Sequence, residues 1–294
     1  MSTATASYAT ATDGVSLAYY QHGDPAAPTV VCVHGYPDNH TVWDGVVPLL
    51  TDRFHVVAYD VRGTGESGEP AGRDGYRIGQ LADDLATIIA AVDPDRPIHL
   101  LAHDWGSIQS WGAVTDPRFA GRLASYTSIS GPSLDMAGRW LRHGLRHPRD
   151  LARQLLDSYY IAAFQLPVLP ELSVRTGVID ALVTRSARIG VPPDQRKPAV
   201  RRPQRDAING IELYRANILS RPGGSRPGRA VCPVLVLAPL DDAHVTVPLA
   251  TQAPEPFVDD LRTQTIPGNH WVVEQDPQLI ADCFTEFVTS LDEG

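Results

Sequence analysis

The sequence has little cysteine and no long apolar run. Its 294 residues contain three cysteines, Cys32, Cys232 and Cys283, far apart and without Cys-x-x-Cys spacing. We therefore expect core thiols in a reducing compartment, with no disulfide and no metal centre. No apolar run approaches the about 20 residues of a membrane span. The amino terminus lacks a charged segment followed by an apolar core, so we expect no signal peptide and a cytoplasmic location.

Positive charge is scarce outside one segment. The net charge is −9, yet residues 136–229 hold 17 of the 25 Lys and Arg and only 7 of the 34 Asp and Glu. This shift predicts a separate basic module packed on an acidic core. A solvated basic surface is its ordinary interpretation, and an anionic lipid surface is a weaker alternative. The segment lacks the motifs and interleaved aromatics typical of nucleic-acid binding.

Short apolar segments alternate with helical patterns, which predicts an α/β fold with a mainly parallel sheet and helices on both faces. The helical patterns cover 79–92, 107–115 and 276–289. Residues 132–225 are Arg-rich, proline-punctuated and helical, so we expect a helical cap between core segments 1–131 and 226–294, with a return linker at 220–229. The predicted strands are Thr29–Val33, His55–Tyr59, Ile98–Ala102, Ser125–Ser130, Val234–Ala238 and Leu261–Ile266.

An aspartate stands where many hydrolases carry a nucleophilic serine. Residues 100–107 read Leu-Leu-Ala-His-Asp-Trp-Gly-Ser. An apolar strand followed by small-x-nucleophile-x-small is the pattern of the α/β-hydrolase nucleophile elbow. Asp104 is ionised at neutral pH without a base, because the ordinary pKa of aspartate is about 3.9. Its natural target is a saturated carbon with a leaving group, such as an epoxide or an alkyl halide.

Three other positions complete a candidate site. After the first core strand comes His34-Gly-Tyr-Pro37, where the backbone N–H groups of Tyr36 and Trp105 are expected to form an oxyanion hole, with a turn that suits a cis proline. His270 is the histidine that follows the last predicted strand, at the sheet edge where ligands bind. In this fold the acid follows the preceding strand, which leaves Asp242, favoured for its Asp-x-x-Val context, or its neighbour Asp241.

Together these motifs resemble α/β-hydrolase-fold epoxide hydrolases over nearly the whole chain. The resemblance is closest to the hydrolase portion of actinobacterial epoxide hydrolase/short-chain dehydrogenase fusions. It rests on His34–Pro37, Tyr59-Asp-Val-Arg62-Gly-Thr-Gly65, Ala102–Gly106, Asp242 and His270-Trp271. Pro239 and Glu66 depart from the family pattern, which affects the loops before the acid and after Arg62.

The resemblance also implies roles for aromatic residues. Such epoxide hydrolases hold and protonate the epoxide oxygen with two cap tyrosines, which correspond here to Tyr160 and Tyr214. It assigns Phe164 and Trp271 to substrate binding, whereas Tyr159 is interpreted as cap packing. Phenols with a pKa near 10 can donate a hydrogen bond and then a proton to the developing alkoxide.

The sequence therefore predicts an epoxide hydrolase that forms a covalent Asp104 ester and hydrolyses it with His270-activated water. No metal or organic cofactor is expected. The partners are a small hydrophobic epoxide and water, and a homodimer is compatible with the sequence. The alternatives are a haloalkane dehalogenase, for which Asn at position 36 is typical, and a ligand-binding protein derived from a hydrolase.

Overall fold

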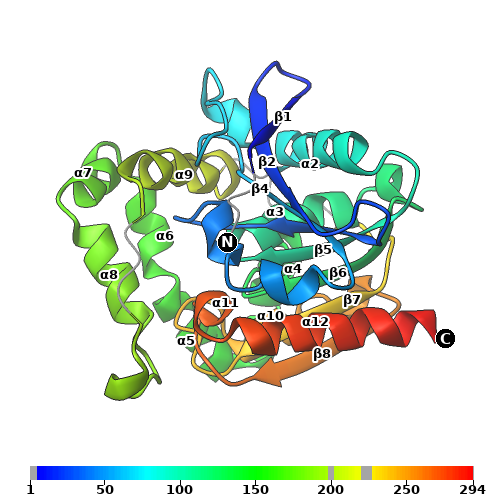
Figure 1. Ribbon diagram of the computed structural model, residues 1–294. Helices are drawn as coiled ribbons and strands as arrows, with labels where there is room; N and C mark the ends of the chain where they lie inside the picture. The colour runs from blue at the N-terminus through cyan, green and yellow to red at the C-terminus, as the bar shows by residue number, and fades with distance from the viewer. Residues whose placement is uncertain (1–4, 198–201, 220–226, 294) are drawn as a thin grey trace.

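The computed structural model describes residues 5–197, 202–219 and 227–293, built on one eight-stranded sheet (Figure 1). The strand order is β1-β2-β4-β3-β5-β6-β7-β8, and every neighbouring pair from β4 to β8 is parallel. The six predicted strands are present within two residues at each end. The strands are β1 (Ser7–Thr10), β2 (Ser16–His22), β3 (Thr29–Val33), β4 (His55–Tyr59), β5 (Ile98–His103), β6 (Leu123–Ile129), β7 (Val234–Pro239) and β8 (Leu261–Ile266).

An antiparallel hairpin at the amino terminus was missed by the sequence analysis. β1 pairs with β2 antiparallel, and β2 pairs antiparallel with β4. The signal was Asp13-Gly14 between two short β-type segments, a dipeptide that favours hairpin turns. Gly14 has a φ of 86°, which glycine adopts without steric cost.

Both faces of the sheet are covered by helices, so alternate residues of one strand enter different cores. Val31 and Val33 of β3 pack with α2 (Ile78–Val92) and α3 (Trp105–Val114). Val30 and Cys32 pack on the other face with α1 (Val47–Leu50) and α12 (Pro277–Asp292). This arrangement buries β3 completely and holds the carboxyl ends of the parallel strands in a rigid frame.

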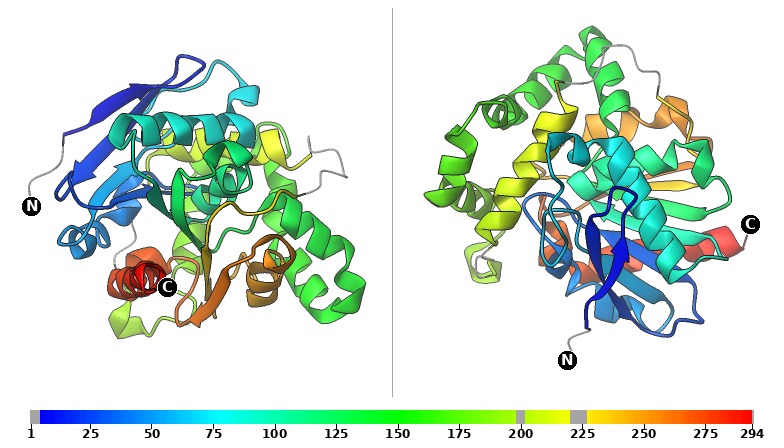
Figure 2. Two further views of the ribbon diagram at one scale, coloured as in Figure 1. Left: turned by 90° about the vertical axis from the view of Figure 1, so that its right-hand side faces the viewer. Right: turned by 90° about the horizontal axis from the view of Figure 1, so that it is seen from above.

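Between β6 and β7 the described residues form six α-helices, which we call the cap. In Figure 1 the helices α6, α7, α8 and α9 lie to the left of the sheet, and the right-hand view of Figure 2 shows them on the same side. Residues 198–201, and 220–226 of the expected return linker, lie outside the described residues. The cap helices are α4 (Leu134–Arg142), α5 (Pro148–Asp157), α6 (Tyr159–Phe164), α7 (Leu169–Arg175), α8 (Val178–Ser186) and α9 (Gln204–Asn217).

The cap is tied to the core by a buried arginine. Arg202 forms ion pairs with Asp38 of the core and with Glu274, the latter at 3.1 Å, and its guanidinium stacks over the Trp271 ring.

Among the described residues, no helix is long and apolar enough to cross a membrane. The short remaining helices are α10 (Val247–Gln252) and α11 (Val272–Gln275).

Candidate active site

Asp104 occupies a strained turn between the central strand β5 and helix α3. Its backbone has φ 52° and ψ −124°, an uncommon conformation for a residue with a side chain. A Cβ on Gly106 would lie 2.1 Å from the carbonyl oxygen of Val33, so only glycine permits this close turn. Asp104 is 7% exposed, and its side chain lines a cavity. The expected elbow is therefore present, with its carboxylate aimed into a pocket.

Backbone donors hold one oxygen of this carboxylate. The N–H of Tyr36 donates to Asp104 Oδ1 at 2.7 Å, and a hydrogen bond from the Trp105 backbone helps to lower the pKa of Asp104. A Cβ on Gly35 would lie 2.4 Å from Oδ1, so glycine is required there too. The Tyr36–Pro37 peptide bond is cis. The structure thus brings together the two backbone groups expected to form an oxyanion hole.

A second carboxylate and a histidine lie beside Asp104. The Nδ1 atom of His270 is 3.1 Å from Asp242 Oδ2, and its Nε2 is 3.4 Å from Asp104 Oδ2. Asp242 Oδ1 accepts hydrogen bonds from the backbone N–H groups of His244 and Val245 at 2.8 and 3.0 Å. These bonds fix the carboxylate facing the imidazole.

The neighbouring acid does not reach the histidine. The Asp241 side chain is exposed, whereas Asp242 is 3% exposed. The backbone N–H of Asp241 donates to the carbonyl of Gly268 on the His270 loop. Asp241 therefore helps to hold that loop, and of the two adjacent acids it is Asp242 that contacts His270.

Asp104, His270 and Asp242 form a contiguous group in which the two carboxylates stabilise the imidazolium form of His270. Burial alone would lower the pKa of His270, but the charge of Asp242 and the hydrogen bond to Asp104 outweigh it and raise the pKa to about 10. Burial alone would raise the pKa of Asp104, but the hydrogen bond to His270 and the positive charge of His270 hold the pKa of Asp104 below its ordinary value. The pKa of Asp242 is lowered for the same reason. Asp104 is thus a carboxylate at neutral pH.

Two cap tyrosines face this carboxylate. Tyr160 comes from α6 and Tyr214 from α9, with ring centroids 6.0 Å apart, and both line the cavity. The Tyr214 ring packs edge-on against Trp105 at 4.8 Å and Tyr36 at 5.4 Å, which fixes its position over the elbow. Burial and the charge of Asp104 both raise the pKa of each phenol. The phenols therefore stay protonated and can donate.

The cavity holds about 570 Å³ and separates the elbow from the cap. Phe164, 6% exposed, and Trp271, 3% exposed, lie in its wall as expected. The interpretation of Tyr159 as cap packing is wrong, because its side chain is 67% exposed and lines the same cavity. Helix α6 places Tyr160 inward and turns its preceding residue toward the opening.

Sequence reasoning missed two further histidines at the site. The His244 ring lies between Tyr160 and His270, with centroid distances of 5.3 and 4.7 Å. Burial and the charge of His270 lower its pKa to about 4, so it is neutral at physiological pH. His103 Nε2 donates to the backbone carbonyl of His270 at 2.8 Å and supports that loop. The only signal was position, since each lies within two residues of Asp242 or Asp104.

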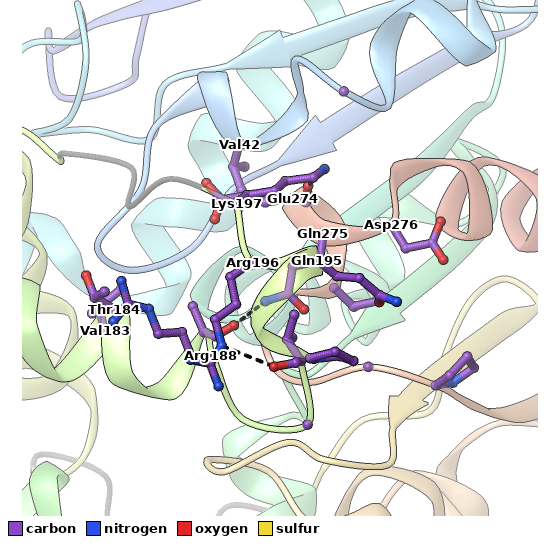
Figure 3. Close-up of a pocket in the computed structure, with 18 of the residues that line it drawn as sticks. Val42, Val183, Thr184, Arg188, Gln195, Arg196, Lys197, Glu274, Gln275 and Asp276 are labelled. Atoms are coloured by element: carbon purple, nitrogen blue, oxygen red, sulfur yellow. Dashed lines mark hydrogen bonds between the residues drawn. The ribbon is translucent and has the colours of Figure 1, made fainter.

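A second cavity of about 510 Å³ lies on the other side of α8 (Figure 3). Its wall carries Arg188, Arg196 and Lys197, and the Lys197 ammonium donates to the backbone carbonyl of Glu274 at 2.7 Å. It shares Val183 with the first cavity but includes none of Asp104, Asp242 or His270. The chemistry-bearing groups therefore converge on the first cavity.

Comparison with known proteins agrees with this geometry. Residues 28–276 match the family model described as alpha/beta hydrolase fold. The chain belongs to this family. The fold class expected from the sequence is thereby confirmed, and enzymes of this fold carry their nucleophile on the same strand-to-helix elbow.

The similar curated proteins include ones named as an oxidoreductase and as epoxide hydrolases. "Probable oxidoreductase EphD" of Mycobacterium tuberculosis is 37% identical over 290 residues, which cover 95% of this chain and 49% of that protein. The chain thus spans about half the length of these relatives. "Epoxide hydrolase 3" of Mus musculus is 28% identical over 287 residues, 95% of this chain and 75% of the mouse protein. A solved structure of epoxide hydrolases from hot-environment metagenomes superposes with a TM-score of 0.77 at 21% identity, over 97% and 99% of the two chains, and shows a shared fold.

Proposed function

We propose that the protein hydrolyses an epoxide to a vicinal diol through a covalent aspartyl ester. The observation that carries this proposal is the cavity in which an ionised Asp104 faces two protonated phenols, Tyr160 and Tyr214. A carboxylate nucleophile and neutral proton donors on opposite sides of a substrate fit the opening of a strained, neutral ring. The names of the similar epoxide hydrolases support the same assignment.

In the first step Asp104 Oδ2 attacks an epoxide carbon. Its partner Oδ1 is held by the Tyr36 N–H, whereas Oδ2 faces His270 across 3.4 Å. As the carbon–oxygen bond of the ring breaks, Tyr160 or Tyr214 donates its proton to the alkoxide. The proton held by His270 then restores the tyrosine, which leaves a neutral imidazole and a hydroxyalkyl ester on Asp104.

In the second step the neutral His270 removes a proton from water. The resulting hydroxide attacks Cγ of Asp104, and the N–H groups of Tyr36 and Trp105 stabilise the oxyanion. The ester bond breaks, and the leaving alkoxide takes the proton from His270 to give the diol. The Asp104 carboxyl that remains then transfers its proton to His270. Asp242 keeps the imidazole oriented throughout, through contacts of 3.1 and 3.2 Å.

The alternatives fit the site less well. A haloalkane dehalogenase needs donors for a halide ion, yet position 36 is tyrosine and its ring packs against Phe164 and Tyr214. A halide leaving group also needs no proton, so a dehalogenase would not need Tyr160 and Tyr214 as proton donors. A binding protein derived from a hydrolase would not need the Asp104–His270–Asp242 contacts.

A cytoplasmic location, a homodimer and the boundaries of the cap stay predictions.

A substrate panel tests the proposal. We expect the purified protein to form diols from styrene oxide and from long-chain fatty epoxides, because the cavity wall is mainly apolar and aromatic. Product is measured by chromatography beside halide release from 1-chlorohexane and 1-bromobutane. Halide release without diol formation would assign the dehalogenase function instead, and neither product would favour a binding role.

Removing the two phenols should slow ring opening selectively. Tyr160→Phe and Tyr214→Phe should each lower the single-turnover alkylation rate about tenfold to a hundredfold, since each removes one proton donor. The double variant should nearly stop alkylation by epoxides. Tyr159→Phe is the matched control, because Tyr159 is 67% exposed and stands next to Tyr160. If the double variant opens styrene oxide at the parental rate, the tyrosines have no part in the reaction.

The two steps should differ in their dependence on pH. Alkylation should be nearly constant from about pH 5 to 9, because the pKa of Asp104 lies below its ordinary value and those of the tyrosines above theirs. Ester hydrolysis needs neutral His270. The ester removes the charge of Asp104, but the charge of Asp242 still raises the pKa of His270, so the rate of hydrolysis should fall as the pH falls. Acid-quenched intact-mass measurements should therefore show more ester at pH 5 than at pH 8. An alkylation rate that drops toward pH 5 would contradict the assignment.

A further inference from the structure

The mouth of the catalytic cavity is a ring of exposed apolar side chains. Each of these residues lines the cavity, yet between 41% and 73% of its surface is open to solvent. A contiguous apolar patch of this kind marks an interaction site, because its exposure to water is unfavourable. The ring consists of Leu156, Tyr159, Leu169, Val178, Leu182 and Ile189.

The turn between α6 and α7 extends this patch with an aliphatic tip. Val168 has a φ of 67° and is 72% exposed, and the N–H of Leu169 donates to the carbonyl of Pro167 at 2.7 Å. This is a γ-turn with positive φ, which is rare and strained, most of all for a β-branched residue. The strained turn exposes the Val168 side chain to solvent, and the nearby residues Leu166 and Leu172 are 46% and 51% exposed. Such strain is typical of functional segments.

Arg185 lines the same cavity, and Arg188 and Arg196 lie with it around a surface hollow along α8. Arg175 ends α7, Arg185 and Arg188 lie on and just after α8, and Arg196 follows, all with exposed side chains. None of the four forms an ion pair with another residue in the described part of the chain. Three acids lie nearby: Glu171 pairs with Arg215 at 2.6 Å, Asp157 is 3.7 Å from Arg153, and Asp180 lies among Arg185, Arg188 and Arg196. The arginines of this surface therefore remain in excess over its unpaired acids.

We propose that this face of the cap docks on an anionic lipid surface. The Val168 turn and the mouth residues would enter the boundary between headgroups and acyl chains, while Arg175, Arg188 and Arg196 bind the phosphates. Tyr159 suits the same boundary, because its ring is apolar and its hydroxyl is polar. A symmetric second copy fits this face poorly, since an isologous contact would set the arginines against each other. If the proposed function holds, an apolar epoxide would then pass from the bilayer straight into the cavity.

Vesicle sedimentation tests the docking without any turnover. The protein should pellet with vesicles of phosphatidylcholine and phosphatidylglycerol at about 0.1 M salt, and much less with phosphatidylcholine alone or at 1 M salt. The double variant V168S/L172S should weaken this binding at least tenfold. Neither residue lines the cavity, so conversion of a water-soluble epoxide and the melting temperature should stay unchanged.

Two further variants separate the contributions. Leu49→Ser is the matched control, because Leu49 is 42% exposed on α1 of the core, and it should bind vesicles normally. Arg175→Gln combined with Arg188→Gln should weaken binding and flatten its dependence on salt. Equal binding to neutral vesicles, no binding at all, or an equal loss in Leu49→Ser would overturn the proposal. A dimer by light scattering that V168S/L172S converts to monomer would identify a second copy as the occupant. These results do not depend on diol formation, so the docking and the catalytic proposal can fail separately.

Discussion

Asp104→Ala should abolish diol formation, because no other group at the site can form the ester. We expect a loss of at least about 10⁴-fold in kcat, since removal of a covalent nucleophile normally costs several orders of magnitude. The fold should survive, because alanine leaves the backbone contacts of the elbow intact and adds no atom near Val33. Diol formation from styrene oxide is the measurement, with the melting temperature as the control for folding.

Residual activity above about a hundredth of the parental rate would contradict this assignment. A single turnover in ¹⁸O-water gives an independent answer. Because water attacks the carboxyl carbon, the first diol should carry an unlabelled oxygen from Asp104, and the label should enter the protein. A fully labelled first diol would mean that water attacks the epoxide directly, with Asp104 acting only as a charge.

The parts of the site that the sequence predicted are those that steric demands tie to one local pattern. The elbow requires glycine at 106 because a Cβ would meet the backbone of β3, and the turn before Tyr36 requires Gly35 because a Cβ would meet Asp104 itself. Chain order then locates the acid and the histidine after β7 and β8. Each of these constraints can be recognised from a pattern of a few neighbouring residues in the sequence.

The parts that were missed depend on contacts between distant segments. His244 reaches Tyr160 across 84 positions of sequence, and Arg202 joins Asp38 to Glu274 from the base of the cap. The resemblance selects Tyr160 over the adjacent Tyr159, but only the path of α6 shows that Tyr159 lines the cavity as well. The apolar residues at the cavity mouth likewise come from four helices, α5, α6, α7 and α8.

Asp241 and Asp242 provide a matched pair that tests the orientation of His270. Asp242→Asn should slow ester hydrolysis strongly, since it removes the charge that stabilises the imidazolium and weakens control of the tautomer. Asp241→Asn should change little, because that side chain is exposed and its loop contact uses the backbone N–H. Single-turnover hydrolysis rates measure both. The opposite order of effects would make Asp241 the functional acid.

His270→Gln should separate the two halves of the reaction. Alkylation needs ionised Asp104 and the tyrosine donors, so it should still proceed in this variant. It should be slower, because the variant loses the positive charge of His270 that lowers the pKa of Asp104 and the proton of His270 that restores the tyrosine. Hydrolysis needs a base within reach of the Asp104 carboxyl, and burial lowers the pKa of the remaining histidines at the site, His244 and His103, which makes both weaker bases. The ester should therefore accumulate, and intact-mass spectrometry should show a protein heavier by one epoxide, with steady-state turnover lower by at least about a thousandfold. Peptide mapping should place the added mass on the segment that contains Asp104. If the variant releases diol at the parental rate and never gains mass, His270 is not the base, and the water must be activated elsewhere in the cavity.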